Sequence, residues 1–293
     1  MSARSVFYGS RRGVGNFIEK GRILGLLHSL FLGFIQGLTE FLPVSSSGHL
    51  VLFQRFFGLH EPELFFDICL HVGTLGAVCL FFRRDIAGLV KATLAWIACR
   101  GQVASMSPAQ REDLILVGLI LAGSVPTAIL GLVIKEFSQM IFASLALVGV
   151  MLCLTAGLLA ATALIPQGRD QKLTLPKALL IGLIQGVAVL PGLSRSGSTI
   201  VLALFLGVSR ERAARFSFLL SIPAIVGASL LSLLDISAVS GPGWGVIAAG
   251  TAVSAVTGYL ALRLLVYIVG QGKLHFFAPY CLIVGLIALA VGW

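Results

Sequence analysis

Two short polar clusters interrupt an otherwise apolar chain, and both carry residues suited to binding an anion. The first is Pro43-Val44-Ser45-Ser46-Ser47-Gly48, and the second is Pro191-Gly192-Leu193-Ser194-Arg195-Ser196-Gly197. Serine-rich turns that lead into helices leave backbone N–H groups free and direct the positive end of the helix dipole at one point. Arg195 adds a permanent charge and a planar fork that matches phosphate oxygens. Together these features favour phosphate over carboxylate or halide as the ligand.

A carboxylate and an amide precede the first cluster on one helix face. Glu40 lies four residues after Gln36, so the two side chains are neighbours on a helix. An ionisable residue in so apolar a segment is costly and is a functional candidate by default. Glu40 could hold a divalent cation against the phosphates, with Gln36 contributing a neutral oxygen. In the alternative interpretation, Glu40 pairs with Arg195 and only locks two segments together.

Candidates for proton transfer and for nucleophilic attack follow directly. His49 comes after the first cluster and titrates near neutrality, so it can give or take a proton, unless backbone groups satisfy it at a helix start. Ser45, Ser46 and Ser47 could each attack phosphorus, or could only cap a helix while water attacks. The remaining histidines are expected at packing or surface positions: His28, His60, His71 and His275.

The composition places these clusters in a membrane protein. Of 293 residues, 57% are hydrophobic and 11% are charged, whereas soluble domains carry about 25% charged residues. So few charges cannot cover the surface of a soluble protein. We therefore expect an all-α integral membrane protein, which excludes disordered, fibrous and ordinary cytosolic classes. The net charge of +9 fits basic cytoplasmic loops better than nucleic-acid binding, and the five cysteines show no metal-ligand spacing.

Hydropathy predicts six transmembrane helices and two re-entrant helical hairpins. The six spans are about 64–82, 114–134, 141–164, 214–235, 244–266 and 276–293. The clusters break two further apolar regions, 23–57 and 177–207. If both regions return to the side they entered, loops with 13 Lys and Arg share one face, which is then cytoplasmic. Apart from the tail, the opposite face holds only Arg55 and Lys135. The basic tail, residues 1–22, is expected to be disordered, and 23–293 to form a single membrane domain.

The two broken regions repeat at an offset of 149 residues. Ile35-Gln36-Gly37 matches Ile184-Gln185-Gly186, and Ser45, Ser47 and Gly48 match Ser194, Ser196 and Gly197. The repeat halves span about 23–134 and 177–266. The predicted topology makes the repeat inverted, so the hairpins would enter from opposite leaflets and meet tip to tip at a polar midplane site. Close packing of small residues alone would not require Arg, Glu or His.

At these motifs the sequence resembles a known family. The segment from Gln36 to His49 resembles the (E/Q)xxxE-to-SS(S/T)GH segment of bacterial undecaprenyl-diphosphate phosphatases, and Pro191 to Thr199 resembles their PGxSRSGxT segment. The resemblance implies hydrolysis of undecaprenyl diphosphate to undecaprenyl phosphate, which recycles the lipid carrier for cell-wall synthesis and confers bacitracin resistance. It also implies a bacterial inner-membrane enzyme that opens to the periplasm. Its partners would be the polyprenyl diphosphate lipid and membrane lipids, with a homodimer left open.

The resemblance assigns roles to residues of this chain. Gln36 and Glu40 would hold a divalent cation, Mg²⁺ or Ca²⁺. Glu40, Ser46, His49 and Arg195 would be catalytic, with His49 moving a proton and Ser46 acting as nucleophile or phosphate ligand. Many members have Glu where this chain has Gln36, which should weaken cation binding or shift it towards Glu40. A transporter or flippase of polyprenyl phosphate lipids is the alternative function, because inverted repeats also build alternating access. The expected phosphate-binding residues are Ser45, Ser46, Ser47, Ser194, Arg195, Ser196 and Thr199.

Overall fold

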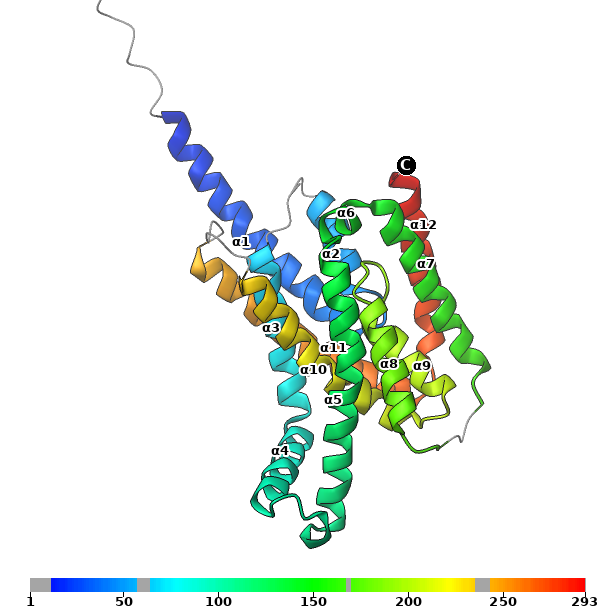
Figure 1. Cartoon of the computed structure of the whole chain (residues 1–293). Helices are drawn as coiled ribbons and strands as arrows, with labels where there is room; N and C mark the ends of the chain where they lie inside the picture. Colours follow the sequence, from blue (N-terminus) through cyan, green and yellow to red (C-terminus); the bar gives the residue numbers. More distant parts are fainter. Residues whose placement is uncertain (1–11, 57–63, 167–169, 235–242, 293) are drawn as a thin grey trace, which may run out of the picture.

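The protein is built from helices. The structure, a computed structural model, describes residues 12–56, 64–166, 170–234 and 243–292 (Figure 1). In these ranges the only β pairing is one isolated parallel bridge, between Gln171 and Val208. The α-helices are α1 Arg12–Phe41, α2 Ser46–Phe56, α3 Leu64–Phe81, α4 Arg83–Ala98, α5 Pro108–Lys135, α6 Ser138–Ala143, α7 Leu145–Ala161, α8 Leu175–Val187, α9 Arg195–Phe205, α10 Arg210–Leu234, α11 Trp244–Gly270 and α12 Ala278–Val291. Short 3₁₀ turns lie at Val103–Ser105, Thr162–Leu164 and Leu274–Phe277.

Five helical segments of the described chain are long and apolar enough to cross a membrane. They are α5, α10, α11, the segment Leu145–Leu164 and the segment Leu274–Val291. A sixth arises if α3 and α4, which are bent by 77° relative to each other, count as one span. The structure therefore confirms an all-helical protein with five to six candidate spans.

Two helices differ from the expectations. Residues 83–98, expected in a loop, form α4, because this alanine- and leucine-rich stretch contains no proline to stop a helix. Helix α1 begins at Arg12, ahead of the expected boundary at residue 23, and no proline precedes Pro43. Residues 1–11 of the basic tail lie outside the described residues.

Both polar clusters end a helix and start a short one. Helix α1 ends at Phe41, just before Pro43, and α8 ends at Val187, just before Pro191. Helices α2 and α9 follow, each of 11 residues and at equivalent positions of the repeat. Such a helix is about 16 Å long, half the thickness of a bilayer core. Figure 1 shows α2 extending towards the upper side of the bundle and α9 towards the lower side.

The α8–α9 hairpin returns to the point where it began. The N–H of Gln171, ahead of α8, donates to the carbonyl of Gly207, after α9, over 3.0 Å. The bridge between Gln171 and Val208 continues this pairing. The chain therefore enters and leaves the hairpin at one place.

The helices of the two repeat halves interlock through glycine contacts. Helix α1 packs against α11, and its repeat equivalent α8 packs against α5. A Cβ atom added at Gly33 of α1 would collide with the carbonyl oxygen of Gly250, and one added at Gly182 of α8 with that of Gly123. Gly33 and Gly182 are 149 residues apart. Each hairpin is thus held by a helix of the other half, through backbones that only glycine lets approach so closely.

Aromatic packing fixes the tip of the first hairpin. The ring of Phe41, which is fully buried, lies edge-on to Phe218 of α10 with centroids 5.9 Å apart. The ring of Phe82 also packs against Phe218, with centroids 5.9 Å apart. Because Phe41 follows Glu40 directly, this packing sets the depth at which the Glu40 carboxylate lies.

We predict that α1 tolerates a methyl group at one glycine and not at another. Gly33→Ala should lower the free energy of unfolding by about 1–3 kcal/mol, because its Cβ meets the Gly250 backbone. Gly25→Ala in the same helix has open space around its Cβ and should be neutral or stabilising by up to about 1 kcal/mol. Thermal unfolding of the purified protein in detergent measures both. Equal shifts in Tm for the two variants would contradict the interlocked packing.

Candidate active site

The tips of the two hairpins are in direct contact. The Ser45 hydroxyl oxygen accepts a hydrogen bond from the N–H of Gly192 at 3.1 Å, across 147 residues of sequence. A Cβ atom on Gly48 would lie 3.0 Å from the Cα of Gly192, so the two backbones leave no room for a side chain there. The structure therefore brings the two polar clusters together, as the repeat predicted.

Equivalent serines cap the two short helices. Ser45 and Ser194 each accept a hydrogen bond from the N–H three residues later, that of Gly48 at 3.3 Å and that of Gly197 at 3.1 Å. These bonds satisfy donors that a helix start otherwise leaves open. Ser45 has φ of 71°, a left-handed conformation that costs energy in a residue other than glycine. Its two backbone contacts hold it there.

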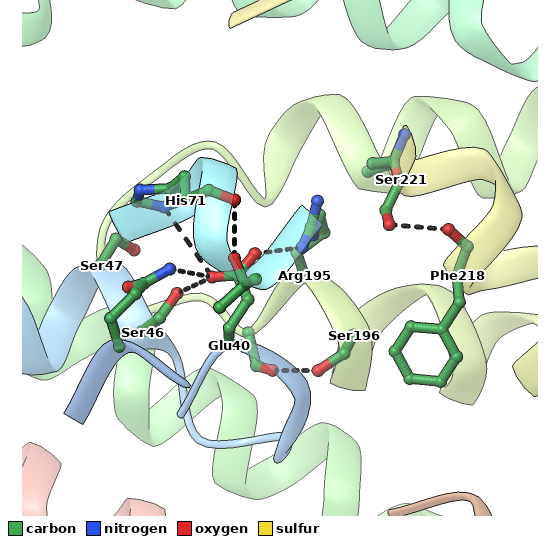
Figure 2. Close-up of polar contacts among 12 residues, drawn as sticks. Glu40, Ser46, Ser47, His71, Arg195, Ser196, Phe218 and Ser221 are labelled. Atoms are coloured by element: carbon green, nitrogen blue, oxygen red, sulfur yellow. Dashed lines mark hydrogen bonds and ion pairs between the residues drawn. The ribbon is translucent and has the colours of Figure 1, made fainter. Parts of the chain in front are cut away.

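Glu40 is the centre of the site and collects groups from both hairpins. Its side chain is buried, and its Oε1 forms an ion pair with the Arg195 guanidinium of α9. Its Oε2 accepts hydrogen bonds from the Ser46 hydroxyl at 2.6 Å and from Gln36 Nε2 at 2.9 Å. Figure 2 shows Glu40 between Arg195 on one side and Ser46 on the other. Three predicted site residues thus contact a fourth, Glu40.

Sequence reasoning missed His71 of α3, which was expected at a packing or surface position. Its Nε2 faces Glu40 Oε2 at 3.8 Å (Figure 2), while its Nδ1 donates to the backbone carbonyl of Asp67 at 2.8 Å. The signal that could have found it was an ionisable side chain inside the apolar stretch 64–82. The repeat could not have revealed His71, because the equivalent position in the second half is Leu220.

His49 points to a different set of groups. Its Nδ1 lies 2.8 Å from the carbonyl oxygen of Ser45, and its Nε2 lies 2.8 Å from the hydroxyl of Tyr280 on α12. The imidazole also stacks on the Tyr280 ring, with centroids 5.7 Å apart. Both nitrogens of His49 therefore have partners other than Glu40, Ser46 and Arg195. Nothing in the sequence indicated Tyr280.

The other predicted phosphate ligands surround the caps. Ser47 lies 3.4 Å from the Ser45 hydroxyl, and Ser196 lies 3.3 Å from the Ser194 hydroxyl, which are repeat-equivalent pairs. The Thr199 hydroxyl donates to the carbonyls of Arg195 and Ser196 in its own helix. Thr199 is therefore close to the site, but its hydroxyl proton is already donated to the backbone.

The donor atoms around Glu40 fit a hard cation in one respect. Gln36 Oε1 is buried and has no hydrogen-bond partner among the described residues. Because a carboxylate only accepts hydrogen bonds, the Gln36 amide must turn its nitrogen towards Glu40. Its oxygen then points away from Glu40 and has no donor in the described part of the chain. The described residues contain no cluster of three or more His, Cys, Asp and Glu side chains suited to a metal. One carboxylate with neutral oxygens is nevertheless a set that Mg²⁺ uses when phosphate completes the shell.

Comparison with known proteins identifies a family. Residues 29–287 match the family model described as bacitracin resistance protein BacA. A protein named undecaprenyl-diphosphatase from Desulfosudis oleivorans is 49% identical, over 91% of this chain and 98% of its own length. Relatives with the same name from Desulfatibacillum aliphaticivorans and Korarchaeum cryptofilum are 48% and 42% identical, each over 91% of this chain and 99% of its own length.

Proposed function

The chain belongs to the bacitracin resistance protein BacA family, and we propose that it hydrolyses undecaprenyl diphosphate to undecaprenyl phosphate and inorganic phosphate. The observation that supports this most strongly is the convergence of Arg195, Glu40 and Ser46 between two opposed helix starts. The activity recycles the lipid carrier for cell-wall synthesis and gives resistance to bacitracin. The names of the relatives are those of a hydrolase, which favours hydrolysis over lipid transport.

The terminal phosphate binds between the starts of α2 and α9. Both helix dipoles direct their positive ends at this point, and backbone N–H groups are the donors that phosphate meets at such ends. The guanidinium of Arg195 has five N–H donors, so it can contact Glu40 and a phosphate oxygen together. Its side chain is 20% exposed, whereas that of Glu40 is 4% exposed, so the cation is the more accessible member of the pair.

Ser46 is the nucleophile that the geometry supports. Its hydroxyl donates to Glu40 at 2.6 Å, which is the contact expected between a hydroxyl nucleophile and its base. Attack by the serine oxygen on the terminal phosphorus breaks the bond to the bridging oxygen and releases undecaprenyl phosphate, while Glu40 takes the serine proton. Water then hydrolyses the phosphoserine and releases inorganic phosphate. His49, bonded to Tyr280, remains the proposed proton-transfer residue.

A divalent cation, Mg²⁺ or Ca²⁺, would be held by Glu40 and Gln36. The unpartnered Gln36 oxygen supports this assignment. When bound, the cation supplies positive charge to the phosphate oxygens. The protein's own part is to fix the oxygens of Gln36 and Glu40 one helical turn apart on α1.

The membrane arrangement is part of the proposal. The chain is a multi-pass membrane protein, and we place it in the inner membrane with the α1–α2 and α8–α9 hairpins entering from opposite leaflets. The backbone pairing of Gln171 with Gly207 supports a re-entrant α8–α9 segment. The excess of basic residues supports an entry from the cytoplasmic side, and with it we propose that the α1–α2 hairpin and the opening of the site belong to the periplasmic side.

Phosphate release is the assay that tests the function. Arg195→Ala and Glu40→Ala should each lower the rate of release from undecaprenyl diphosphate by at least about 100-fold, because each removes a charge that acts on the reacting phosphate. Arg263→Ala removes an exposed arginine of α11 and should leave the rate unchanged. An unchanged rate of phosphate release in both site variants would contradict the proposal.

The same assay separates serine attack from attack by water. With substrate labelled at the terminal phosphate, acid-quenched wild-type protein should retain label, and Ser46→Ala should retain none. Label-free wild-type protein during steady turnover would assign the attack to water and leave Ser46 as a phosphate ligand.

Cysteine labelling tests the re-entrant arrangement. In a variant without the five native cysteines, Lys172→Cys and Glu211→Cys flank the α8–α9 hairpin at exposed positions, and Phe137→Cys follows α5 at the other end of a span. A membrane-impermeant maleimide should label position 137 in intact bacteria, and positions 172 and 211 only after permeabilisation. Labelling of 172 and 211 from opposite sides would make α8–α9 a full crossing.

A further inference from the structure

We infer that His71, through Nε2, is a third ligand of the divalent cation proposed at Glu40. The inference rests on the proposed function, which requires a cation at this place, and it specifies what holds the cation in this chain. Gln36 and Glu40 lie on α1, whereas His71 comes from α3, a separate helix that packs against α1. The site would then be built by two helices and not by one helix face.

The spacing of the donor atoms supports a shared cation. His71 Nε2 lies 3.8 Å from Glu40 Oε2, which is too far for a hydrogen bond. Two ligands at bonds of about 2.1 Å from one ion lie roughly 3 Å apart when adjacent and roughly 4 Å apart when opposite. The observed separation falls within that range. The side chain of His71 is 31% exposed, so an ion can reach it.

The other ring nitrogen of His71 fixes which atom faces Glu40. Nδ1 lies 2.8 Å from the Asp67 carbonyl oxygen, which can only accept, so Nδ1 carries a proton. A neutral imidazole held this way turns the lone pair of Nε2 towards the Glu40 carboxylate, and two lone pairs repel unless a positive charge lies between them. Histidines that bind metals usually donate their second N–H to a carbonyl or carboxylate in this manner.

The orphan oxygen of Gln36 completes the set. A half-turn of the amide exchanges its two terminal atoms, which places Oε1 where Nε2 now lies, 2.9 Å from Glu40 Oε2. Two oxygens at that distance repel in the absence of a cation and are normal neighbours in the shell of one. The exchange gives the oxygen the cation as its partner and moves the amide nitrogen to the position that Oε1 now occupies. Glu40 Oε1 stays with Arg195 throughout.

A nitrogen ligand changes which cations the site prefers. Ca²⁺ and Mg²⁺ favour oxygen ligands, whereas imidazole raises the affinity for transition ions such as Mn²⁺. Because Gln36 is neutral, Glu40 is the carboxylate of the set, and His71 supplies the further electron pair that a second carboxylate would otherwise provide. We therefore expect Mn²⁺ to bind more tightly than Ca²⁺.

Mn²⁺ serves as the probe, with full-length protein in lipid nanodiscs and no substrate. The electron spin echo of bound Mn²⁺ should show modulation from one imidazole ¹⁴N, and labelling the wild-type protein with ¹⁵N-histidine should replace it by that of ¹⁵N. His71→Gln should abolish the modulation and weaken Mn²⁺ binding about tenfold or more, since even outer partners of a metal ligand contribute 10–100-fold. His275→Gln, which changes a histidine of the 3₁₀ turn Leu274–Phe277 before α12, should change neither.

Absence of nitrogen modulation in the wild-type protein, or its survival in His71→Gln, overturns the inference. The isotope exchange needs no substitution, so misfolding of His71→Gln does not remove the test. Phosphate release, measured in the same nanodiscs, separates the two proposals. Release without nitrogen modulation refutes ligation by His71 and leaves the phosphatase in place. Nitrogen modulation without release from undecaprenyl diphosphate refutes the phosphatase and leaves the ligand assignment.

Discussion

The ion pair between Glu40 and Arg195 joins two hairpins that belong to different halves of the repeat. A charge buried without a partner in an apolar environment costs several kcal/mol, so each of these two residues is tolerable at its depth because the other is present. The proline breaks, the serine caps and the interlocking glycines all serve to bring this pair together. Helix starts leave backbone N–H donors that lipid cannot satisfy, and Ser45 and Ser194 each accept a hydrogen bond from one of them. The two capped helix starts face the same point.

In the function that we propose, the same pair prepares the site for an anionic lipid headgroup. Arg195 is the more exposed partner, so an entering phosphate meets a positive charge first. The carboxylate beneath it already accepts the hydroxyl proton of Ser46. An isolated carboxylate at this position would repel phosphate, and an isolated arginine would bind it without a base at hand. Under this proposal, pairing the two gives a site that attracts the headgroup and keeps a base beside the reacting bond.

Much of this site could be predicted from the sequence, but little of its surroundings could. The 149-residue repeat, together with the re-entrant topology expected from the basic loops, was sufficient to predict that the clusters of Ser45 and Ser194 meet, and the two are in contact. It could not reveal His71 or Tyr280, since neither has a counterpart in the repeat and contacts between separate helices depend on packing. The orientation of His49 was equally open, because its partner Tyr280 lies on a separate helix, 231 residues away. Helix α4 was missed because its charged first turn, Arg83-Arg84-Asp85, resembles a loop.

A double-mutant cycle on the pair tests the central claim most directly. Unfolding free energies are measured for the wild type, Glu40→Gln, Arg195→Gln and the double variant in the same detergent. Removing Arg195 alone should cost about 3–5 kcal/mol, because it leaves the Glu40 carboxylate buried without a partner. The double variant should recover much of that loss, which corresponds to a coupling energy of about 2–3 kcal/mol. Single effects that add within about 0.5 kcal/mol would show that the hairpins do not depend on this contact.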